Sequence, residues 1–260
     1  MVAPARRVRG VMTTERAFAA GTAVLFAASA AITASWCGSM TAMDGMAMPW
    51  VRMPGQSWPG AATSFLGMWT VMMVAMMLPT LAPMLARYRR AVGVTNASRL
   101  GALTLIVGGG YFLVWTLAGL VIYPVGAALA DAQMRWPGLA RVVPIAVGAV
   151  VLIAGVLQFS RWKTQQLACC RQLAARGHAL RSDARSARRH GLLLGIQCSR
   201  CCAGLTTVLL VIGVMDLRAM AGVTAAIAIE RLAPAGWRAA QLIGGLVIAA
   251  GSLLIVRAFV

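Results

Sequence analysis

The cysteines of this chain are grouped, and one group has a spacing typical of metal sites. Three of the six cysteines, Cys198, Cys201 and Cys202, form the pattern C-x-x-C-C. On an α-helix these positions fall within an arc of about 100°, so their sulfur atoms face one side of the helix. Three sulfur atoms so close suit a trigonal Cu(I) site, or three of the four ligands of a zinc site.

Two further cysteines, Cys169 and Cys170, lie in a basic segment that precedes the first group. If the chain folds back, they raise the number of clustered sulfur atoms to five. Arg200 lies between the grouped cysteines, and a cationic neighbour favours the thiolate that a metal binds. Two other interpretations stay open: buried cysteines that act as small apolar side chains, and a redox pair formed by Cys198 and Cys201.

Methionine is the second soft ligand that the chain concentrates. Sixteen methionines are present, and eleven of them lie between residues 40 and 84. Met43, Met46 and Met48 form a short motif that resembles those of copper-handling proteins. A thioether is a neutral, soft donor that suits Cu(I) and discriminates against hard ions. We therefore expect this segment to collect copper.

A methionine stripe continues into the apolar segment that follows. Met72 and Met76 share one face of a helix at an interval of four residues, and Met73 and Met77 share the neighbouring face. One interpretation is a path for a metal ion. The other is that methionine fills irregular gaps between packed helices.

The composition places these residues in a membrane protein. Apolar residues make up 60% of the chain and charged residues 12%, against roughly 45–50% and about 25% in soluble domains. The net charge of +18 comes from basic residues in short clusters between long uncharged runs, a distribution typical of membrane proteins and not of nucleic-acid-binding ones. Six acidic residues and two histidines leave little material for catalysis, so we expect no enzyme.

We predict an all-α polytopic transmembrane helical bundle, formed by a single integral membrane domain over residues 1–260. A spanning helix needs about 20 mostly apolar residues. Seven segments are candidates and one is short, which gives six or seven spans. The segments are Ala17–Ser35, Ala61–Met84, Leu100–Pro124, Val142–Ser160, Gly191–Met215, the short Leu217–Ile229, and Ala239–Val256.

Basic residues set the orientation of such a bundle. Sixteen of them lie on one side of the predicted spans and four on the other. We therefore expect residues 1–16 to form a cytoplasmic tail, 36–60 a methionine-rich outer loop and 161–190 a basic cytoplasmic loop. The location is a bacterial-type inner membrane, with the N-terminus in the cytoplasm. The alternative for the first span is a secretory signal peptide.

Polar residues at the ends of spans are further candidates. Met215 and Asp216 follow the fifth span and form a candidate polar site at its outer end. Glu230 and Arg231 end the short helix, and ionisable residues at such depths are functional candidates. We interpret Arg231 as an interfacial anchor, and we expect both histidines, which lie in the basic loop, to be solvated.

Together these residues resemble the family described as domain of unknown function 2182, predicted metal-binding integral membrane proteins. The resemblance covers about residues 60–250. The family pattern usually has a cysteine, a glycine, a tryptophan and an asparagine where this chain has Gln166, Arg200, Ala203 and Asp216. The resemblance rests on Met68-Trp69, Ala75-Met76-Met77-Leu78-Pro79, Pro83-Met84, Gln158, Lys163, Cys170-Arg171, Cys198-Ser199-Arg200-Cys201-Cys202, Gly213-Val214-Met215-Asp216-Leu217, Met220 and Glu230-Arg231.

The leading hypothesis is Cu(I) handling, with zinc as the second metal that the cysteines would accept. Outer methionines would collect the ion, and the methionine stripe and the cysteines would hold or relay it. The purpose would be transport, or delivery to a membrane copper enzyme. One alternative is a non-catalytic accessory subunit of a membrane complex. The other is a thiol oxidoreductase with a reversible Cys198–Cys201 disulfide.

Overall fold

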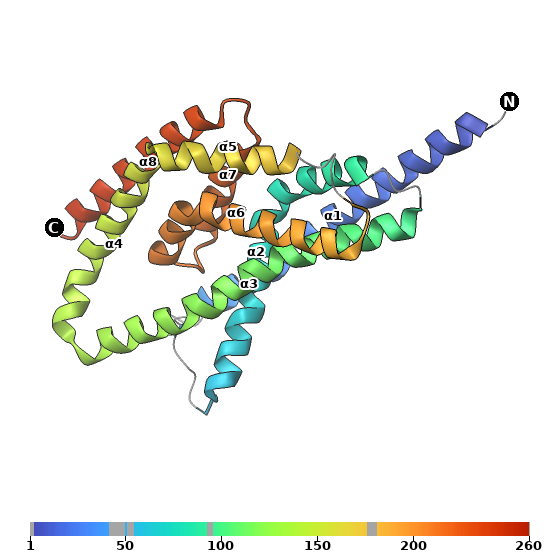
Figure 1. Ribbon diagram of the computed structural model, residues 1–260. Coiled ribbons are helices and arrows are strands. Elements are labelled where there is room, and N and C mark those ends of the chain that lie inside the picture. The colour runs from blue at the N-terminus through green and yellow to red at the C-terminus, as the bar shows by residue number, and fades with distance from the viewer. Residues whose placement is uncertain (1–2, 42–49, 51–54, 93–95, 176–180, 260) are drawn as a thin grey trace.

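The computed structural model describes residues 3–41, 50, 55–92, 96–175 and 181–259. Within these ranges the chain forms eight α-helices and no β-strands (Figure 1). This confirms the all-α class that the sequence predicts. The helices are α1 (Ala3–Thr41), α2 (Trp58–Val92), α3 (Ala97–Arg135), α4 (Pro137–Leu157), α5 (Arg161–Ala175), α6 (Ala184–Ile212), α7 (Leu217–Leu232) and α8 (Gly236–Arg257).

Several of these helices have the length and apolarity of membrane spans. Among the described residues, α1, α2, α3, α6 and α8 each qualify alone, and α4 with α5 gives a sixth span if that bent pair counts as one. The pair turns by 64° between Leu157 and Arg161. Helix α7 has 16 residues and corresponds to the predicted short segment. The fold is therefore a polytopic bundle, as predicted.

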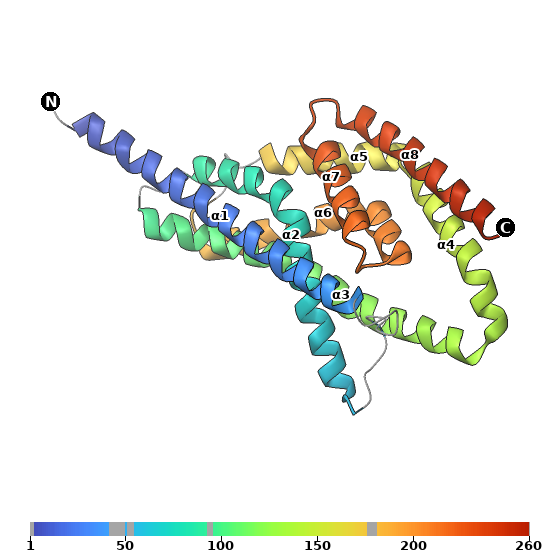
Figure 2. The same ribbon diagram turned by 180° about the vertical axis from the view of Figure 1, so that it is seen from behind.

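Helix α2 lies at the centre of the bundle. In its most apolar stretch 61% of the residues are buried, against 11% in α1. Trp69 of α2 is fully buried, and its indole N–H donates to the carbonyl of Trp115 on α3 at 2.8 Å. Figure 2 shows α1 crossing the outside of α2 and α3. Most side chains of this stretch of α2 therefore face protein, whereas most of the corresponding stretch of α1 is not buried.

Two pairs of helices are held by close backbone approach at glycines. Helices α3 and α6 lie side by side in both views (Figures 1 and 2). A Cβ atom at Gly195 of α6 would lie 2.9 Å from the Tyr111 carbonyl oxygen of α3. Helices α4 and α8 form the second pair, where a Cβ atom at Gly251 would lie 2.7 Å from the Leu152 nitrogen. Small residues permit such contacts between membrane helices.

The segment 161–190, expected as a basic loop, is mostly helical. It contains α5 and the first turns of α6, whose N-terminus is capped by Asp183 accepting from the Ser186 backbone N–H at 2.6 Å. Hydropathy marks only the part of a helix that lies among apolar groups, so the predicted spans contain neither α5 nor the polar start of α6. Figure 1 shows α5 running from the bend along the upper edge of the view, beside α7 and α8.

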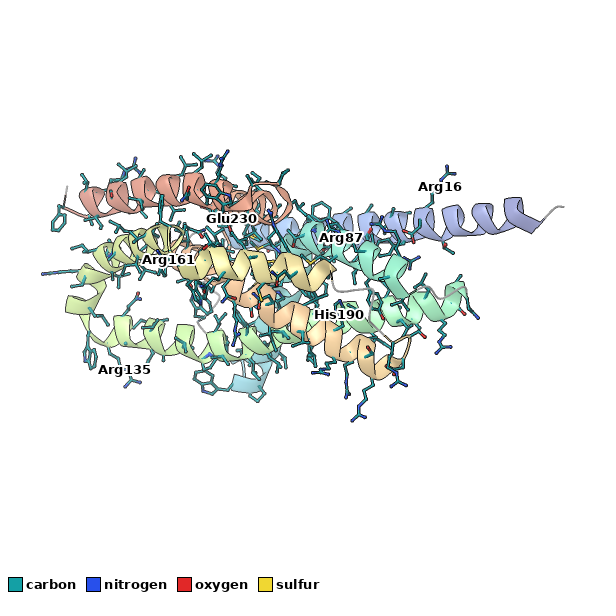
Figure 3. All side chains as sticks on the ribbon, turned by 45° about the horizontal axis from the view of Figure 1, so that its top comes forward. Arg16, Arg87, Arg135, Arg161, His190 and Glu230 are labelled. Atoms are coloured by element: carbon teal, nitrogen blue, oxygen red, sulfur yellow. The ribbon has the colours of Figure 1, made fainter. Side chains whose placement is uncertain are left out.

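The labelled arginines agree only in part with the two sides that the sequence assigns to them. Figure 3 shows Arg16 far from Arg135, as predicted. Arg161, which the sequence assigns to the side of Arg16, lies at the bend nearer to Arg135. Which end faces the cytoplasm stays a prediction.

Candidate metal centre

Helices α5 and α6 bring four of the six cysteines together in the interior. Cys198, Cys201 and Cys202 of α6 are at most 1% exposed, on one helix face as the C-x-x-C-C spacing predicts, and Cys170 of α5 is 2% exposed. All four belong to one buried core, and Arg231 contacts both Cys198 of α6 and Cys170 of α5. These four residues are called the thiol cluster below. Cys169, the fifth cysteine of the predicted group, is exposed.

The spacing inside the thiol cluster is compatible with shared coordination. The Sγ atoms of Cys198 and Cys202 lie 3.9 Å apart. Two sulfur atoms that each bind one ion at about 2.3 Å, the distance typical of zinc thiolates, lie at most about 4.6 Å apart. Cys198 and Cys202 therefore lie close enough to bind one ion without movement of the helix backbone.

A guanidinium group lies among these thiols. Arg231, in the last turn of α7, is 6% exposed. Its Nη1 donates to Cys198 Sγ at 2.8 Å, and its Nη2 to Cys170 Sγ at 3.4 Å. The expectation that Arg231 is an interfacial anchor is therefore wrong. Sulfur acceptors inside the bundle give its long side chain partners away from the membrane surface.

The cationic neighbour of the cysteines is Arg231 and not Arg200. Arg200 is exposed, because it lies on the opposite side of α6 from the buried thiols. Tyr111 of α3 supplies a second donor, with its hydroxyl 2.9 Å from Cys198 Sγ. A sulfur that accepts from a guanidinium and a phenol is well placed to carry negative charge, because charge-assisted hydrogen bonds are the stronger kind.

Among the described residues, no three His, Cys, Asp or Glu side chains converge in an arrangement that would hold a metal ion. Within the thiol cluster, the Arg231 guanidinium contacts two of the four sulfur atoms. Its two terminal nitrogens contact Cys198 and Cys170 separately, so these two sulfur atoms are directed at the guanidinium. Coordination by Cys170 together with Cys198 would require the guanidinium to move.

A buried ion pair lies beside the thiol cluster. Lys163 Nζ of α5 is 2.6 Å from Glu230 Oε2 of α7, and Gln158 Nε2 donates to Glu230 Oε1 at 2.9 Å. Lys163 also donates to the Cys201 carbonyl oxygen at 2.9 Å. Residues far apart in the sequence thus form one polar network around the bend between α4 and α5. The sequence marked Glu230 as a candidate but did not predict these partners.

A cavity reaches this network from the surface of the bundle. Its volume is about 230 Å³, and it lies between α4, α5 and α6. Most of its lining is apolar, but Gln158, Lys163 and Cys201 also line it, as does Ala203. Because Ala203 stands where the resemblance leads us to expect a tryptophan, this chain has a small side chain at the cavity wall.

The methionine stripe of α2 faces the interior. Met72, Met73, Met76 and Met77 are at most 3% exposed and belong to the same core as the thiol cluster. Farther along α2, Met84 Sδ lies 3.3 Å from Arg231 Nη2. Burial is expected both of a metal path and of simple packing, so the choice between them stays a prediction. The predicted ligands Met43, Met46 and Met48 lie outside the described residues.

The candidate polar site at Met215 and Asp216 has a different composition from the thiol cluster. Met215 Sδ lies 3.8 Å from Cys37 Sγ of α1. Asp216 is the N-cap of α7, where its carboxylate accepts from the backbone N–H groups of Arg218 and Ala219 at 2.8 and 3.1 Å. Asp216 therefore has a structural role in starting α7, and the contact with Cys37 was not predicted.

Two further expectations concern polar residues near the thiol cluster. His190, expected to be solvated, is 8% exposed and stacks on Tyr88 with ring centroids 5.5 Å apart. Helix α6 begins earlier than predicted, and this places His190 inside the bundle. His178 lies outside the described residues. Gln166 accepts a hydrogen bond from Gln197 at 2.8 Å, so an amide pair occupies the position where the resemblance has a cysteine.

The fold and the site define a helical membrane-type protein with a buried thiol cluster. Comparison with known proteins is consistent with this class. Residues 66–254, which include the methionine stripe and the thiol cluster, match the model of the PpoB2 family, described as a copper chaperone. The chain belongs to this copper chaperone family. The match supports a copper-related family, whereas membership of domain of unknown function 2182 stays a prediction. Curated proteins and solved structures give no match.

Proposed function

We propose that this protein is a membrane-embedded Cu(I) chaperone that holds the ion in the thiol cluster and delivers it to a membrane copper enzyme or across the membrane. The observation that carries the proposal is the burial of four thiols from two helices in a member of a copper chaperone family. Free cysteine often packs as a small apolar residue. Here Cys198 contacts the Cys202 thiol, a guanidinium and a phenol, which apolar packing does not require.

The donor set favours a soft ion over a hard one. The sulfur atoms of Cys198, Cys202 and Met84 lie around the Arg231 guanidinium or beside it. The neighbouring oxygen ligand, the Glu230 carboxylate, is bound by Lys163 and Gln158. Thiolate and thioether select Cu(I), and thiolate also accepts zinc. Zinc is therefore the competing ion, and metal analysis separates the two.

The route proposed for the ion follows α2. The buried thioethers of Met73 and Met77 lead along this helix toward Met84, which contacts Arg231. Neutral thioethers bind Cu(I) without fixing it by charge, which suits transfer. The cavity lined by Cys201 and Ala203 is the proposed exit toward a client, since it connects the thiol cluster with the surface of the bundle.

The decisive experiment is metal analysis of the purified protein. The chain is loaded anaerobically with Cu(I) in detergent under reducing conditions, washed with a weak chelator and analysed for metal. We expect about one copper per chain in the wild type, with copper–sulfur scattering in its X-ray absorption spectrum. Cys198→Ser and Cys201→Ser should each lower copper retention at least tenfold.

Cys169→Ser is the matched control, because Cys169 is the exposed neighbour of the buried Cys170. It should retain copper as the wild type does. A wild-type chain that holds no copper after loading would refute the proposal. A metal-free chain that copurifies with other membrane proteins would support the accessory-subunit alternative instead.

A further inference from the structure

The guanidinium of Arg231 is bound mainly by sulfur. Its acceptors are the thiols of Cys198 and Cys170, the thioether of Met84 and the hydroxyl of Thr80, at 2.8 to 3.4 Å. Its remaining nitrogen, Nε, is buried without a hydrogen-bond partner among the described residues. The group is therefore held by soft, weak acceptors and is incompletely satisfied where it lies.

No carboxylate balances this buried charge within the described part of the chain. None of the ion pairs there involves Arg231, and the adjacent Glu230 pairs with Lys163 instead. A buried cation is strongly unfavourable without an anionic partner. The most heavily engaged acceptor is Cys198 Sγ, which accepts hydrogen bonds from both Arg231 and Tyr111.

We propose that Arg231 is the resident cation of the thiol cluster. Cu(I) displaces its guanidinium on binding, and the guanidinium displaces Cu(I) on release. This inference rests on the proposed function, because it assigns the regulation of the same site. In the exchange, the N–H···S hydrogen bonds of Arg231 to Cys198 and Cys170 break, copper–sulfur bonds form, and a thiol that binds the ion releases its proton to solvent. No electron is transferred.

The guanidinium and the ion compete for the same sulfur atoms, because Arg231 contacts both Cys198 and Cys170. Return of the guanidinium to these thiols therefore favours release of Cu(I) to a client.

The test measures release of Cu(I) from the loaded, full-length protein to a water-soluble bicinchoninate chelator. Arg231→Ala removes the competitor, so it should release Cu(I) at least tenfold more slowly than the wild type and bind it more tightly. Arg231→Lys keeps the charge but not the two-pronged contact, and it should lie between the two. A residue that only supports the fold would, when removed, weaken binding and speed release.

Thr80→Val provides an independent variant that leaves every sulfur atom in place. Its hydroxyl accepts from Arg231 at 3.1 Å, so its loss loosens the guanidinium, and Cu(I) release should slow by about threefold or more. This variant decides the question if Arg231→Ala does not fold. Arg200→Ala is the matched control, because Arg200 is exposed, and it should release copper at the wild-type rate.

The outcomes separate this inference from the proposed function. Unchanged or faster release from Arg231→Ala, or from Thr80→Val if the alanine variant does not fold, overturns the role of Arg231 while copper binding by the wild type stands. A wild-type protein that binds no copper overturns both. Slower release from the variant, together with loss of copper in Cys198→Ser, supports both.

Discussion

Lys163 and Glu230 form an ion pair sealed from solvent, with Nζ and Oε2 2.6 Å apart and side chains that are 4% and 1% exposed. The pair joins α5 to α7, and the bond from Lys163 to the Cys201 carbonyl oxygen extends it to α6. The three helices that surround the thiol cluster are therefore fixed to one another by one lysine. The hydrogen bonds of Gln197 to Gln166 and of Arg231 to Cys170 support the same arrangement of α5 against α6 and α7.

Breaking this pair should destabilise the protein strongly. Removing one partner of a buried ion pair costs about 3–5 kcal/mol, because the other charge is left uncompensated. We expect Lys163→Met or Glu230→Gln to lower the free energy of unfolding by about this amount, measured by thermal or denaturant unfolding in detergent. The double variant should lose less than the sum of the two single variants. Additive losses would show that the two side chains are not coupled.

Filling the cavity should slow copper exchange without removing the site. Ala203 lines the cavity together with Cys201, so Ala203→Trp would place an indole in its opening. We expect copper stoichiometry to be unchanged and release to a soluble chelator to slow about tenfold. Leu105→Trp is the control, because Leu105 is 77% exposed on α3, and it should release copper normally. Equal release rates in the two variants would exclude the cavity as the exit.

Replacing the sulfur atoms of the methionine stripe distinguishes its two possible roles, a path for the metal ion and simple packing. Met73→Leu and Met77→Leu are volume-conserving changes in fully buried positions, which usually cost less than about 1.5 kcal/mol of stability. If thioethers relay the ion, the double variant should load copper several-fold more slowly while unfolding like the wild type. Met134→Leu, at a 66% exposed position, should load normally. Wild-type loading by the double variant would leave packing as the function of the stripe.

Cysteine labelling tests the orientation. Arg90 and Arg135 are both exposed. Arg90 lies in the last turn of α2, and Arg135 ends α3, the next helix of the chain. In a Cys169→Ser background, Arg90→Cys should react with a membrane-impermeant maleimide only in inside-out vesicles. Arg135→Cys should react in intact spheroplasts. The reverse pattern would place the N-terminus outside. The prediction follows from the excess of basic residues on the side of Arg90.

The membrane helices were predictable because apolar runs of sufficient length have few alternatives. The segments Leu217–Ile229 and Ala239–Val256 fall within α7 and α8, and the spacing of Cys198, Cys201 and Cys202 placed them on one face of α6. The approach of Cys170 to the cysteines of α6, where Arg231 contacts both Cys170 and Cys198, was predicted only as one outcome of the chain folding back, since the sequence gives no signal for the 64° bend.

The burial of Arg231 was not predicted, because an arginine at the end of an apolar helix ordinarily extends to the membrane surface. A signal was present in the charge balance. With only six acidic residues in the chain, the adjacent Glu230 and Arg231 needed partners inside an apolar bundle. Lys163 and the thiol cluster are those partners, and pattern alone cannot join residues that lie on different helices.

The shortness of α7 has a consequence for biosynthesis. Sixteen residues extend about 24 Å, less than the roughly 30 Å hydrocarbon thickness of a bilayer, and this helix ends in two charged side chains. We therefore expect that α7 alone inserts poorly, because it is too short to span the bilayer and carries Glu230 and Arg231 in its last turn. The lysine and thiols that receive those charges leave the ribosome earlier, on α5 and α6. Lys163 and the thiol cluster, which bind Glu230 and Arg231, are thus synthesised before α7.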